Sequence, residues 1–160
     1  MNNSGTYALV IAVAVGLYLR AGRLGIHSLI HGYYVYTDSA LGGLSGRLRY
    51  HLKLKKRLHW HIDYLLREAA IAQIRYALGQ PRLECIWNAI VRGLPGAISS
   101  IPGFGAPDCQ CSFHLTYFPT IPPSNLFEQT LRQSKLPEVY RLDLTKRVNL
   151  QRDKQKSLHS

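Results

Sequence analysis

The feature that most constrains the fold is a near-continuous apolar run close to the start of the chain. Residues 6–20, TYALVIAVAVGLYLR, carry Val, Ile, Leu and Tyr with almost no polar interruption before Arg20. A run of this kind fits either a strand buried on both faces or a helix of similar length. Its β-branched residues and the Ala-Gly pair that follows favour the strand. We therefore expect a buried strand in this part of the chain.

The same run is too short for a membrane anchor. Its apolar part, Ala8 to Tyr18, has 11 residues, whereas a spanning helix needs roughly 20. Residues 1–6 also lack the positive charge that opens a secretory signal peptide. We therefore expect no membrane contact. The simplest setting for the three cysteines is a reduced, cytoplasmic one.

The charge of the chain predicts a polyanionic partner. Twenty Lys and Arg residues stand against nine Asp and Glu, a formal net charge of +11 for 160 residues. An excess of this size attracts polyanions over a distance, so nucleic acid is the leading class of partner. The alternative is a merely soluble basic protein, because net charge speaks to partners and not to fold.

The basic residues are concentrated in one stretch, which has no acid among them: Arg47, Arg49, Lys53, Lys55, Lys56 and Arg57. Most solvated helix faces mix charges of both signs. A purely basic run suits contacts to phosphates, which supply affinity and salt sensitivity without reading the base sequence. We expect Arg49, Lys53, Lys55, Lys56 and Arg57 to bind nucleic acid.

Local patterns predict the order of the other elements. Leu44, Leu48 and Leu52 recur one helical turn apart, which predicts an amphipathic helix with a basic side. Residues 83–93 place apolar side chains on one helical face and stop at a glycine, which predicts a second helix. The segments expected to form further strands are 23–26, 32–36, 72–77 and 112–118.

The length and the pattern together indicate one packed domain followed by a tail. A chain of this size is long enough for one core and short for two. Residues 124–160 alternate charged and polar types with few aromatics, a composition typical of disorder. We expect the domain to cover residues 1–123 and a basic polar tail, partly disordered, to cover residues 124–160.

The segment HWHIDYLL, which begins at His59, brackets a tryptophan with histidines. On an extended segment His59, His61 and Asp63 would point to one face, where they could hold a metal ion or touch phosphate. On a helix they would diverge. The alternative is that Trp60 and Ile62 pack inside while the polar residues form local hydrogen bonds.

A second polar cluster has the composition of a zinc site. Structural zinc is held by four sulfur or nitrogen ligands. Those ligands would be Cys85, Cys109, Cys111 and His114, if the helix at 83–93 packs against the loop before the last strand. The alternative is that the cysteines are small buried residues and His114 is a core histidine, because free cysteine is commonly buried.

Several motifs spread over most of the chain together resemble one family. They are TYALV near the start, GYYVY at 32–36, SALGGL at 39–44, the helix containing Arg47, LHWHIDYLL at 58–66, LEC at 83–85 and GFGAPDCQCSFHLTYF at 103–118. Over about residues 6–118 the chain resembles a little-characterised family related to the GIY-YIG nucleases. That family occurs as stand-alone proteins and as a fusion to the DNA-repair enzyme endonuclease III.

The resemblance implies both a fold and a reaction. The fold is a small α/β (α+β) domain in which a central three-stranded antiparallel sheet is flanked by helices. The reaction is that of a metal-dependent endonuclease, which hydrolyses phosphodiester bonds in DNA with one divalent cation, Mg²⁺ or Mn²⁺. A role in DNA repair follows from the same resemblance.

The resemblance also carries candidate site residues. The motif Gly-Ile-Tyr falls on Gly32, Tyr33 and Tyr34, and the motif Tyr-Ile-Gly falls on Tyr36, Thr37 and Asp38. The family arginine falls on Arg47, and the metal-binding glutamate is best matched by Glu84. The expected catalytic residues are therefore Tyr34, Tyr36, Arg47 and Glu84. Read without the family, Tyr34 and Tyr36 would be packing residues of a strand, because aromatics favour strands.

The chemistry of hydrolysis suits these residue types. An in-line cut needs a group that positions the attacking water, a cation for the pentacovalent charge and a metal ion for the leaving oxygen. The planar fork of Arg47 can make paired hydrogen bonds to a phosphate. Glu84 offers a hard oxygen ligand for Mg²⁺. An unshifted tyrosine is a poor base, because its pKa lies near 10.

Asp38 departs from the family pattern, because the motif has glycine at this position. A carboxylate there could repel DNA or add a metal ligand. Two alternatives to the nuclease therefore remain open: a catalytically inactive nucleic-acid-binding domain and a zinc-stabilised interaction module whose charge serves an acidic protein.

Overall fold

The apolar run near the start of the chain forms the most buried strand of the sheet. In this computed structural model, which describes residues 3–79, 81–99, 101–105 and 114–144, strand β1 (Gly5–Val13) is buried along its whole length. It pairs antiparallel with β4 (Gly32–Ala40) on one side and β5 (Ala70–Leu78) on the other. The predicted buried strand is confirmed.

The rest of the apolar run leaves the main sheet. Strand β2 (Leu17–Arg20) pairs with β3 (Ile26–Leu29) in a separate two-stranded ribbon, with a short 3-10 helix, η1 (Gly22–Leu24), between them. The short strand expected at 23–26 is therefore displaced towards the C-terminus, because η1 occupies residues 22–24.

The main sheet has six strands in the order β6-β7-β4-β1-β5-β8. Its outer strands are β6 (Ile98–Ser99), β7 (Leu115–Phe118) and β8 (Tyr140–Asp143). The expectation of a mixed α+β fold with an antiparallel sheet is confirmed, but a three-stranded sheet is wrong, because short edge strands extend the central β4-β1-β5 on both sides. A strand of two to four residues carries too little alternation to be recognised in the sequence.

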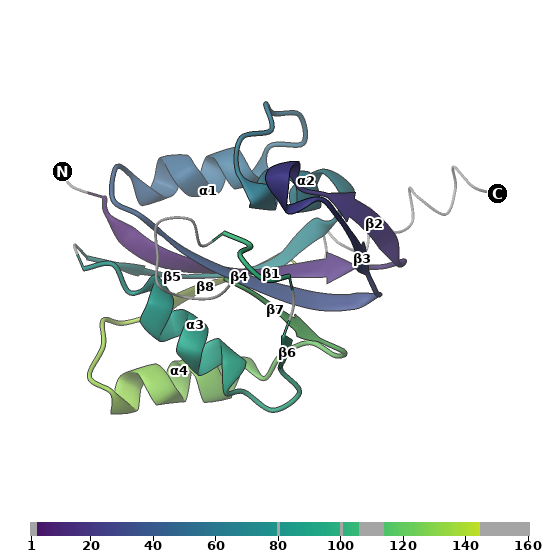
Figure 1. Ribbon diagram of the computed structural model, residues 1–160. Helices are drawn as coiled ribbons and strands as arrows, with labels where there is room; N and C mark the ends of the chain where they lie inside the picture. Colours follow the sequence, from purple (N-terminus) through teal and green to yellow (C-terminus); the bar gives the residue numbers. More distant parts are fainter. Residues whose placement is uncertain (1–2, 80, 100, 106–113, 145–160) are drawn as a thin grey trace.

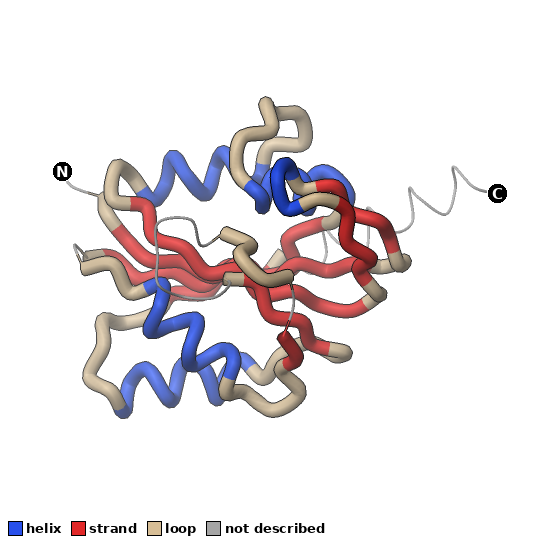
Figure 2. The backbone as a smooth tube through the Cα atoms, viewed as in Figure 1, coloured by secondary structure: helices blue, strands red, loops and turns tan. Residues whose placement is uncertain are grey.

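Helices cover both faces of the sheet (Figures 1 and 2). The helices α1 (Leu44–Leu52) and α2 (His61–Glu68) lie over one face, and α3 (Glu84–Arg92) and α4 (Ser124–Gln133) lie over the other. None of the described helices is long and apolar enough to cross a membrane.

The alternation of β1 explains why this strand is apolar throughout. Its odd-numbered residues, such as Leu9 and Ile11, belong to the core formed with α1 and α2. Its even-numbered residues Ala8 and Val10 belong to the core formed with α3 and α4. Because successive side chains point to opposite faces, a strand covered on both sides must be apolar at every position.

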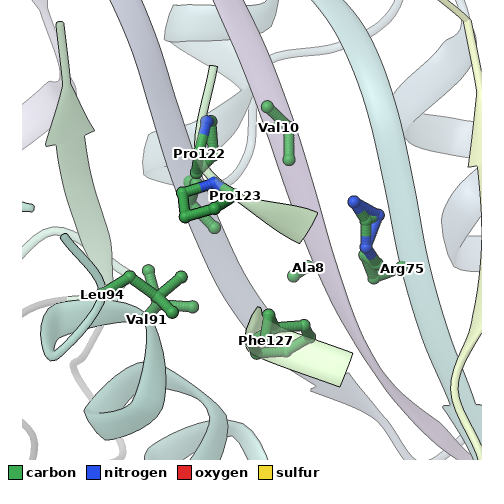
Figure 3. Close-up of a pocket in the computed structure, with 9 residues that line it drawn as sticks. Ala8, Val10, Arg75, Val91, Leu94, Pro122, Pro123 and Phe127 are labelled. Atoms are coloured by element: carbon green, nitrogen blue, oxygen red, sulfur yellow. The ribbon is translucent and has the colours of Figure 1, made fainter. Parts of the chain in front are cut away.

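The core between the sheet and the α3/α4 pair is tightly closed. Trp87 of α3 is fully buried and meets Phe127 of α4 edge-to-face, with ring centroids 5.2 Å apart. A cavity of only about 20 Å³ remains beside Phe127 and Arg75. Figure 3 shows residues that line it. Arg75 of β5 is 4% exposed in its side chain and forms an ion pair of 3.4 Å with Glu128 of α4.

The packed domain continues past the predicted boundary at Pro123. Instead of a disordered tail, residues 124–143 contain α4 and β8, and β8 pairs antiparallel with β5. Phe127 and Leu131 bury one side of α4 in the core. The four-residue spacing of these two residues indicates a helix. The prediction gave more weight to the polar composition of the segment and therefore missed the helix. Residues 145–160 of the expected tail lie outside the described residues.

Candidate functional site

A cavity of about 260 Å³ opens beside β4, past the point where β7 stops pairing with it. The pairing register of β4 with β7 ends at Tyr36, so Asp38 and Ser39 extend beyond it. The lining residues come from several segments that are distant in the sequence: Tyr36, Asp38, Ser39, Arg47, His59, Trp60, His61, Arg82, Gly105 and His114. Most of these side chains are polar, which distinguishes this cavity from the apolar core beneath the sheet.

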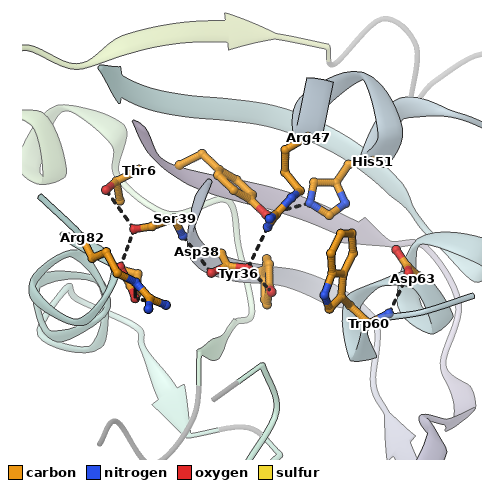
Figure 4. Close-up of polar contacts among 11 residues, drawn as sticks. Thr6, Tyr36, Asp38, Ser39, Arg47, His51, Trp60, Asp63 and Arg82 are labelled. Atoms are coloured by element: carbon orange, nitrogen blue, oxygen red, sulfur yellow. Dashed lines mark hydrogen bonds and ion pairs between the residues drawn. The ribbon is translucent and has the colours of Figure 1, made fainter. Parts of the chain in front are cut away.

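Tyr36, Asp38 and Arg47 form a connected group in the cavity wall (Figure 4). Tyr36 Oη donates a hydrogen bond of 2.9 Å to Asp38 Oδ2, and Arg47 Nη1 lies 3.4 Å from the same oxygen. Burial raises the pKa of Tyr36 well above its ordinary value and also raises the pKa of Asp38. Tyr36 is therefore a hydrogen-bond donor and not a phenolate at neutral pH.

Tyr7 of β1 lies directly behind this group. Its ring centroid is 6.4 Å from that of Tyr36, and its hydroxyl shares a hydrogen bond of 2.7 Å with His51 Nε2 of α1. Burial, together with the nearby cations Lys56 and Arg47, lowers the pKa of His51 to about 3. His51 is therefore neutral, and the pair joins β1 to α1, the helix that carries Arg47.

Glu84 reaches the same end of β4 from the other face of the sheet. It is the first residue of α3 and its side chain is 5% exposed. Ser39 Oγ donates a short hydrogen bond to Glu84 Oε2, and Ser39 Oγ also lies 3.1 Å from Thr6 Oγ1. Arg82 Nε donates a hydrogen bond of 3.0 Å to Glu84 Oε1. Because Ser39 and Arg82 both line the cavity, Glu84 lies immediately behind its wall.

Of the expected catalytic residues, Tyr34 is the one that the structure places away from the cavity. Its ring packs against Tyr117 of β7 at 5.0 Å, and its hydroxyl donates to the backbone oxygen of Ile30 at 3.0 Å. Burial raises the pKa of Tyr34 to about 12. Tyr34 therefore has the surroundings of a packing residue of a strand, which was the alternative to a catalytic role.

The sequence reasoning missed Tyr7, although a signal was present. The pattern Gly-x-Tyr occurs three times, at residues 5–7, 16–18 and 32–34. The first copy lies on β1, where a Cβ on Gly5 would come within 2.5 Å of the Ala77 carbonyl oxygen of β5. Glycine is therefore required at this close approach of strands. The structure brings the tyrosine of the first copy beside Tyr36, whereas Tyr34 of the third copy packs against Tyr117.

The segment His59 to Asp63 is organised by its carboxylate. Asp63 is fully buried and accepts hydrogen bonds of 2.8 Å from the backbone N–H groups of both His59 and Trp60. The helix α2 begins at His61, so the three polar side chains do not share one face. His59 and His61 line the cavity, whereas Asp63 points into the protein. Asp63 therefore forms the local hydrogen bonds that we gave as the alternative to metal binding. The three side chains do not form the single face that metal binding by all of them would need.

The predicted nucleic-acid contacts divide into exposed and buried cations. Arg49, Lys53, Lys55 and Arg57 are exposed. Lys56 differs, because its ammonium donates to the backbone oxygens of Tyr50 and His51 at the end of α1 and lies 4.0 Å from Asp63 Oδ1. Its side chain is 4% exposed, so Lys56 holds α1 to α2 and is not available to a phosphate.

The predicted zinc ligands are only partly described. Cys109 and Cys111 lie outside the described residues, so the structure does not test their part of the predicted zinc site. Cys85 lies on α3 and is disulfide-bonded, not the free thiol that we expected, so it is not available in this structure as the fourth zinc ligand. His114 is buried and lines the cavity, and burial lowers its pKa. Within the described part of the chain, no three His, Cys, Asp or Glu side chains form a group that could hold a metal ion.

The GFG segment closes one side of the cavity. Gly105 has a φ of +71°, and a Cβ at this position would come within 2.6 Å of the Tyr36 ring. Its N–H donates a hydrogen bond of 3.1 Å to His61 Nδ1. Phe104 is fully buried and meets the Tyr36 ring edge-on at 6.2 Å. The segment therefore fixes the position of Tyr36.

Comparison with known proteins supports one assignment. Searches of curated proteins and of solved structures give no match. A family described as domain of unknown function DUF123 matches residues 6–136. This match covers most of the chain, including every described residue that lines the cavity and both helices on each face of the sheet. The chain therefore belongs to the DUF123 family.

Proposed function

We propose that this chain is a metal-dependent nuclease that hydrolyses phosphodiester bonds in DNA, with the cavity beside β4 as its active site. The observation that carries the proposal is the meeting of Tyr36, Arg47 and Arg82 in one cavity, with Glu84 directly behind Arg82. Two guanidinium groups beside hydrogen-bond donors form a site suited to a phosphate. The net charge of +11 favours a polyanionic substrate.

Arg47 is the residue best suited to bind the reacting phosphate. Its side chain is 23% exposed, and the ring of Trp60 holds its guanidinium from one side at 4.5 Å. Its ion-pair partner, Asp38, is also partly exposed. A phosphate that enters the cavity can replace this contact with paired hydrogen bonds, and the arginine then stabilises the charge that builds up on the phosphorus oxygens.

Tyr36 is suited to positioning and not to proton removal. Because burial raises its pKa, the phenol keeps its proton at neutral pH. When its single proton turns away from Asp38, Tyr36 can donate a hydrogen bond to the phosphate or to the attacking water. Asp38, whose oxygen accepts from Tyr36, is the carboxylate in the cavity that can accept a proton from that water. Tyr7 takes the position that the resemblance assigned to Tyr34, and supports Tyr36 from behind.

The donor set fits a divalent cation at Glu84. Mg²⁺ commonly needs only one or two protein carboxylates and keeps several waters, so the absence of a larger acidic group among the described residues is compatible with it. Glu84 would hold Mg²⁺ or Mn²⁺, with the Ser39 hydroxyl beside it; the side chain of Arg82, which is 48% exposed, would have to move aside. A cation bound there would supply charge stabilisation for the leaving oxygen.

A second candidate is a nucleic-acid-binding domain without catalysis, and the ion pair between Asp38 and Arg47 favours it. A carboxylate 3.4 Å from the phosphate-binding arginine repels the phosphate that the reaction needs. A role in DNA repair rests on the family resemblance and belongs to the proposal. The disulfide of Cys85 counts against the reduced, cytoplasmic setting that the cysteines suggested.

Cleavage assays on matched variants test the proposal. The purified protein is incubated with labelled branched, nicked and duplex DNA, with Mg²⁺, with Mn²⁺ and with EDTA. We expect metal-dependent cleavage that disappears in Arg47→Ala and in Glu84→Gln. The controls are Arg67→Ala and Glu68→Gln, an exposed ion pair on α2 outside the cavity, which should cleave like the wild type. Binding without cleavage by the wild type would leave the non-catalytic candidate.

A further inference from the structure

The two tryptophans of the chain have opposite environments. Trp87 is fully buried between α3 and α4, whereas Trp60 is 37% exposed and lines the cavity. A large aromatic side chain on the wall of a polar cavity keeps apolar area in water, and a planar ligand that covered it would remove that area from water. The exposed ring is therefore a candidate contact for a substrate.

The aromatic neighbours of the Trp60 indole leave it without a parallel stacking partner among the described residues. Its aromatic neighbours Tyr50, His51 and His59 meet it at interplanar angles of 90°, 57° and 71°, so none of these described rings stacks on it. The guanidinium of Arg47 lies over the ring at 4.5 Å from the centroid. Figure 4 shows the indole standing next to Arg47 in the cavity wall.

Hydrogen bonds to Asp63 fix the backbone at Trp60 in the absence of a ligand. The buried Asp63 carboxylate accepts hydrogen bonds from the N–H groups of His59 and Trp60, and Tyr50 Oη lies 3.2 Å from the same carboxylate oxygen. The Tyr50 ring contacts the indole edge-on, with centroids 5.4 Å apart. A ring that is fixed in this way loses little conformational entropy when a planar group stacks on it.

We propose that the cavity binds one unpaired nucleotide, whose base stacks on Trp60 while Arg47 holds the adjoining phosphate. Stacking on an aromatic side chain is available to every base and needs a base that has left the duplex. The cavity of about 260 Å³ is near the lower limit of ligand pockets, roughly 300 Å³, a size that suits a single nucleotide better than a base pair. The preferred substrate is therefore DNA with a single-stranded segment. This inference rests on the proposed function.

Tryptophan fluorescence tests the inference without requiring cleavage. The wild-type protein is titrated in EDTA with a thymidine oligonucleotide and with a duplex of the same length. We expect the oligonucleotide to quench Trp60, because a stacked base quenches indole emission, and the duplex to leave it unchanged. Trp60→Phe, which retains Trp87 alone, should bind without quenching. Trp60→Ala should lose roughly 5- to 100-fold in affinity for the single strand and little for the duplex.

A matched control separates stacking from general effects. Tyr18 is 81% exposed on β2 and does not line the cavity, so Tyr18→Ala should bind and quench like the wild type. Circular dichroism confirms that each variant is folded. Binding of the single strand without quenching, or with equal affinity in Trp60→Ala, overturns the inference and leaves the nuclease proposal standing. Failure of the wild type to bind any DNA overturns both.

Discussion

On the α3/α4 face of the sheet, Arg75 lies in a closed core beside a cavity of about 20 Å³, whereas on the α1/α2 face Arg47 lines a cavity of about 260 Å³. The ion-pair distance is 3.4 Å in both cases, to Glu128 for Arg75 and to Asp38 for Arg47. What differs is exposure, because 4% of the Arg75 side chain and 23% of the Arg47 side chain reach solvent.

The difference shows that two ion pairs of the same kind and the same distance can serve different purposes. Arg75 also donates to Gln73, and its partner Glu128 lies on α4, so the pair joins the helix to the sheet. No phosphate can reach a guanidinium that is this deeply enclosed. The pair of Arg47 is open to the cavity, where an anion can displace the carboxylate. Accessibility, and not the presence of an ion pair, therefore separates a structural arginine from a candidate catalytic one.

Removing Arg47 should produce the largest effect, and it should fall on activity. We expect Arg47→Ala to lower the rate of metal-dependent cleavage roughly 10²- to 10³-fold, because the variant loses a group that stabilises the charge of the transition state. Its free energy of unfolding should change by less than about 1 kcal/mol, as for other partly exposed ion pairs. Single-turnover cleavage and urea unfolding of the same samples measure both quantities. A large loss of stability with unchanged cleavage would remove the distinction drawn above.

Removing Arg75 should have the opposite signature. We expect Arg75→Ala to lower the free energy of unfolding by about 3 kcal/mol, because Glu128 then loses its partner and the core gains a void. The cleavage rate per folded molecule should stay near that of the wild type. Urea unfolding followed by far-UV circular dichroism measures the change. Arg67→Ala, which breaks an exposed pair with Glu68, serves as the control and should change stability by under about 0.5 kcal/mol.

Local patterns predicted the parts of the fold that carry strong periodicity. The apolar run gave β1, the leucine spacing gave α1, and the amphipathic segment at 83–93 gave α3. Residues 124–143 were missed, because α4 and β8 are held by contacts to distant segments. A polar composition suggested disorder, but Phe127 and Leu131 are enough to bury one side of α4.

The site was predictable at some residues and not at others. Tyr36 and Arg47 were expected together, and both line the cavity. Tyr7 was hidden inside the apolar run, where its pairing with His51 of α1 cannot be read from local pattern. The structural use of Lys56 was equally invisible, because its partners are backbone carbonyls of another turn. Every residue has a backbone carbonyl, so a hydrogen bond from a side chain to the backbone requires no particular residue type at the acceptor. Such contacts therefore leave no pattern in the sequence.

The two faces should also differ in their response to acid, because His51 is buried on the α1/α2 side. Its pKa is lowered from 6.5 to about 3 in the folded protein, so the unfolded chain binds the proton first. The stability that neutral His51 contributes is therefore present above pH 6.5 and is lost as the pH falls towards 3. We expect the stability advantage of the wild type over His51→Gln to shrink by up to about 1.4 kcal/mol for each pH unit below 6.5.

Urea unfolding of both proteins at several values between pH 7 and pH 5 tests this expectation. Glutamine cannot titrate in this range, so the difference between the two proteins isolates His51 from other groups such as Asp38. A difference that is independent of pH would mean that His51 is protonated equally in the folded and unfolded states.

The smallest effect should come from the exposed cations after α1, which differ from Arg47 in lying outside the cavity. Lys53 and Lys55 are exposed, so they suit screened contacts to phosphates of the bound DNA. We expect the double variant Lys53→Gln, Lys55→Gln to bind duplex DNA a few-fold more weakly at low salt. The slope of log affinity against log salt should become shallower by about 1 to 2. Under the proposed function, the rate of cleavage at saturating DNA should not change, because neither side chain lines the cavity. If that rate fell as it does in Arg47→Ala, the active site would have to extend onto the loop between α1 and α2. The separation between a catalytic cavity and a surrounding binding surface would then be lost.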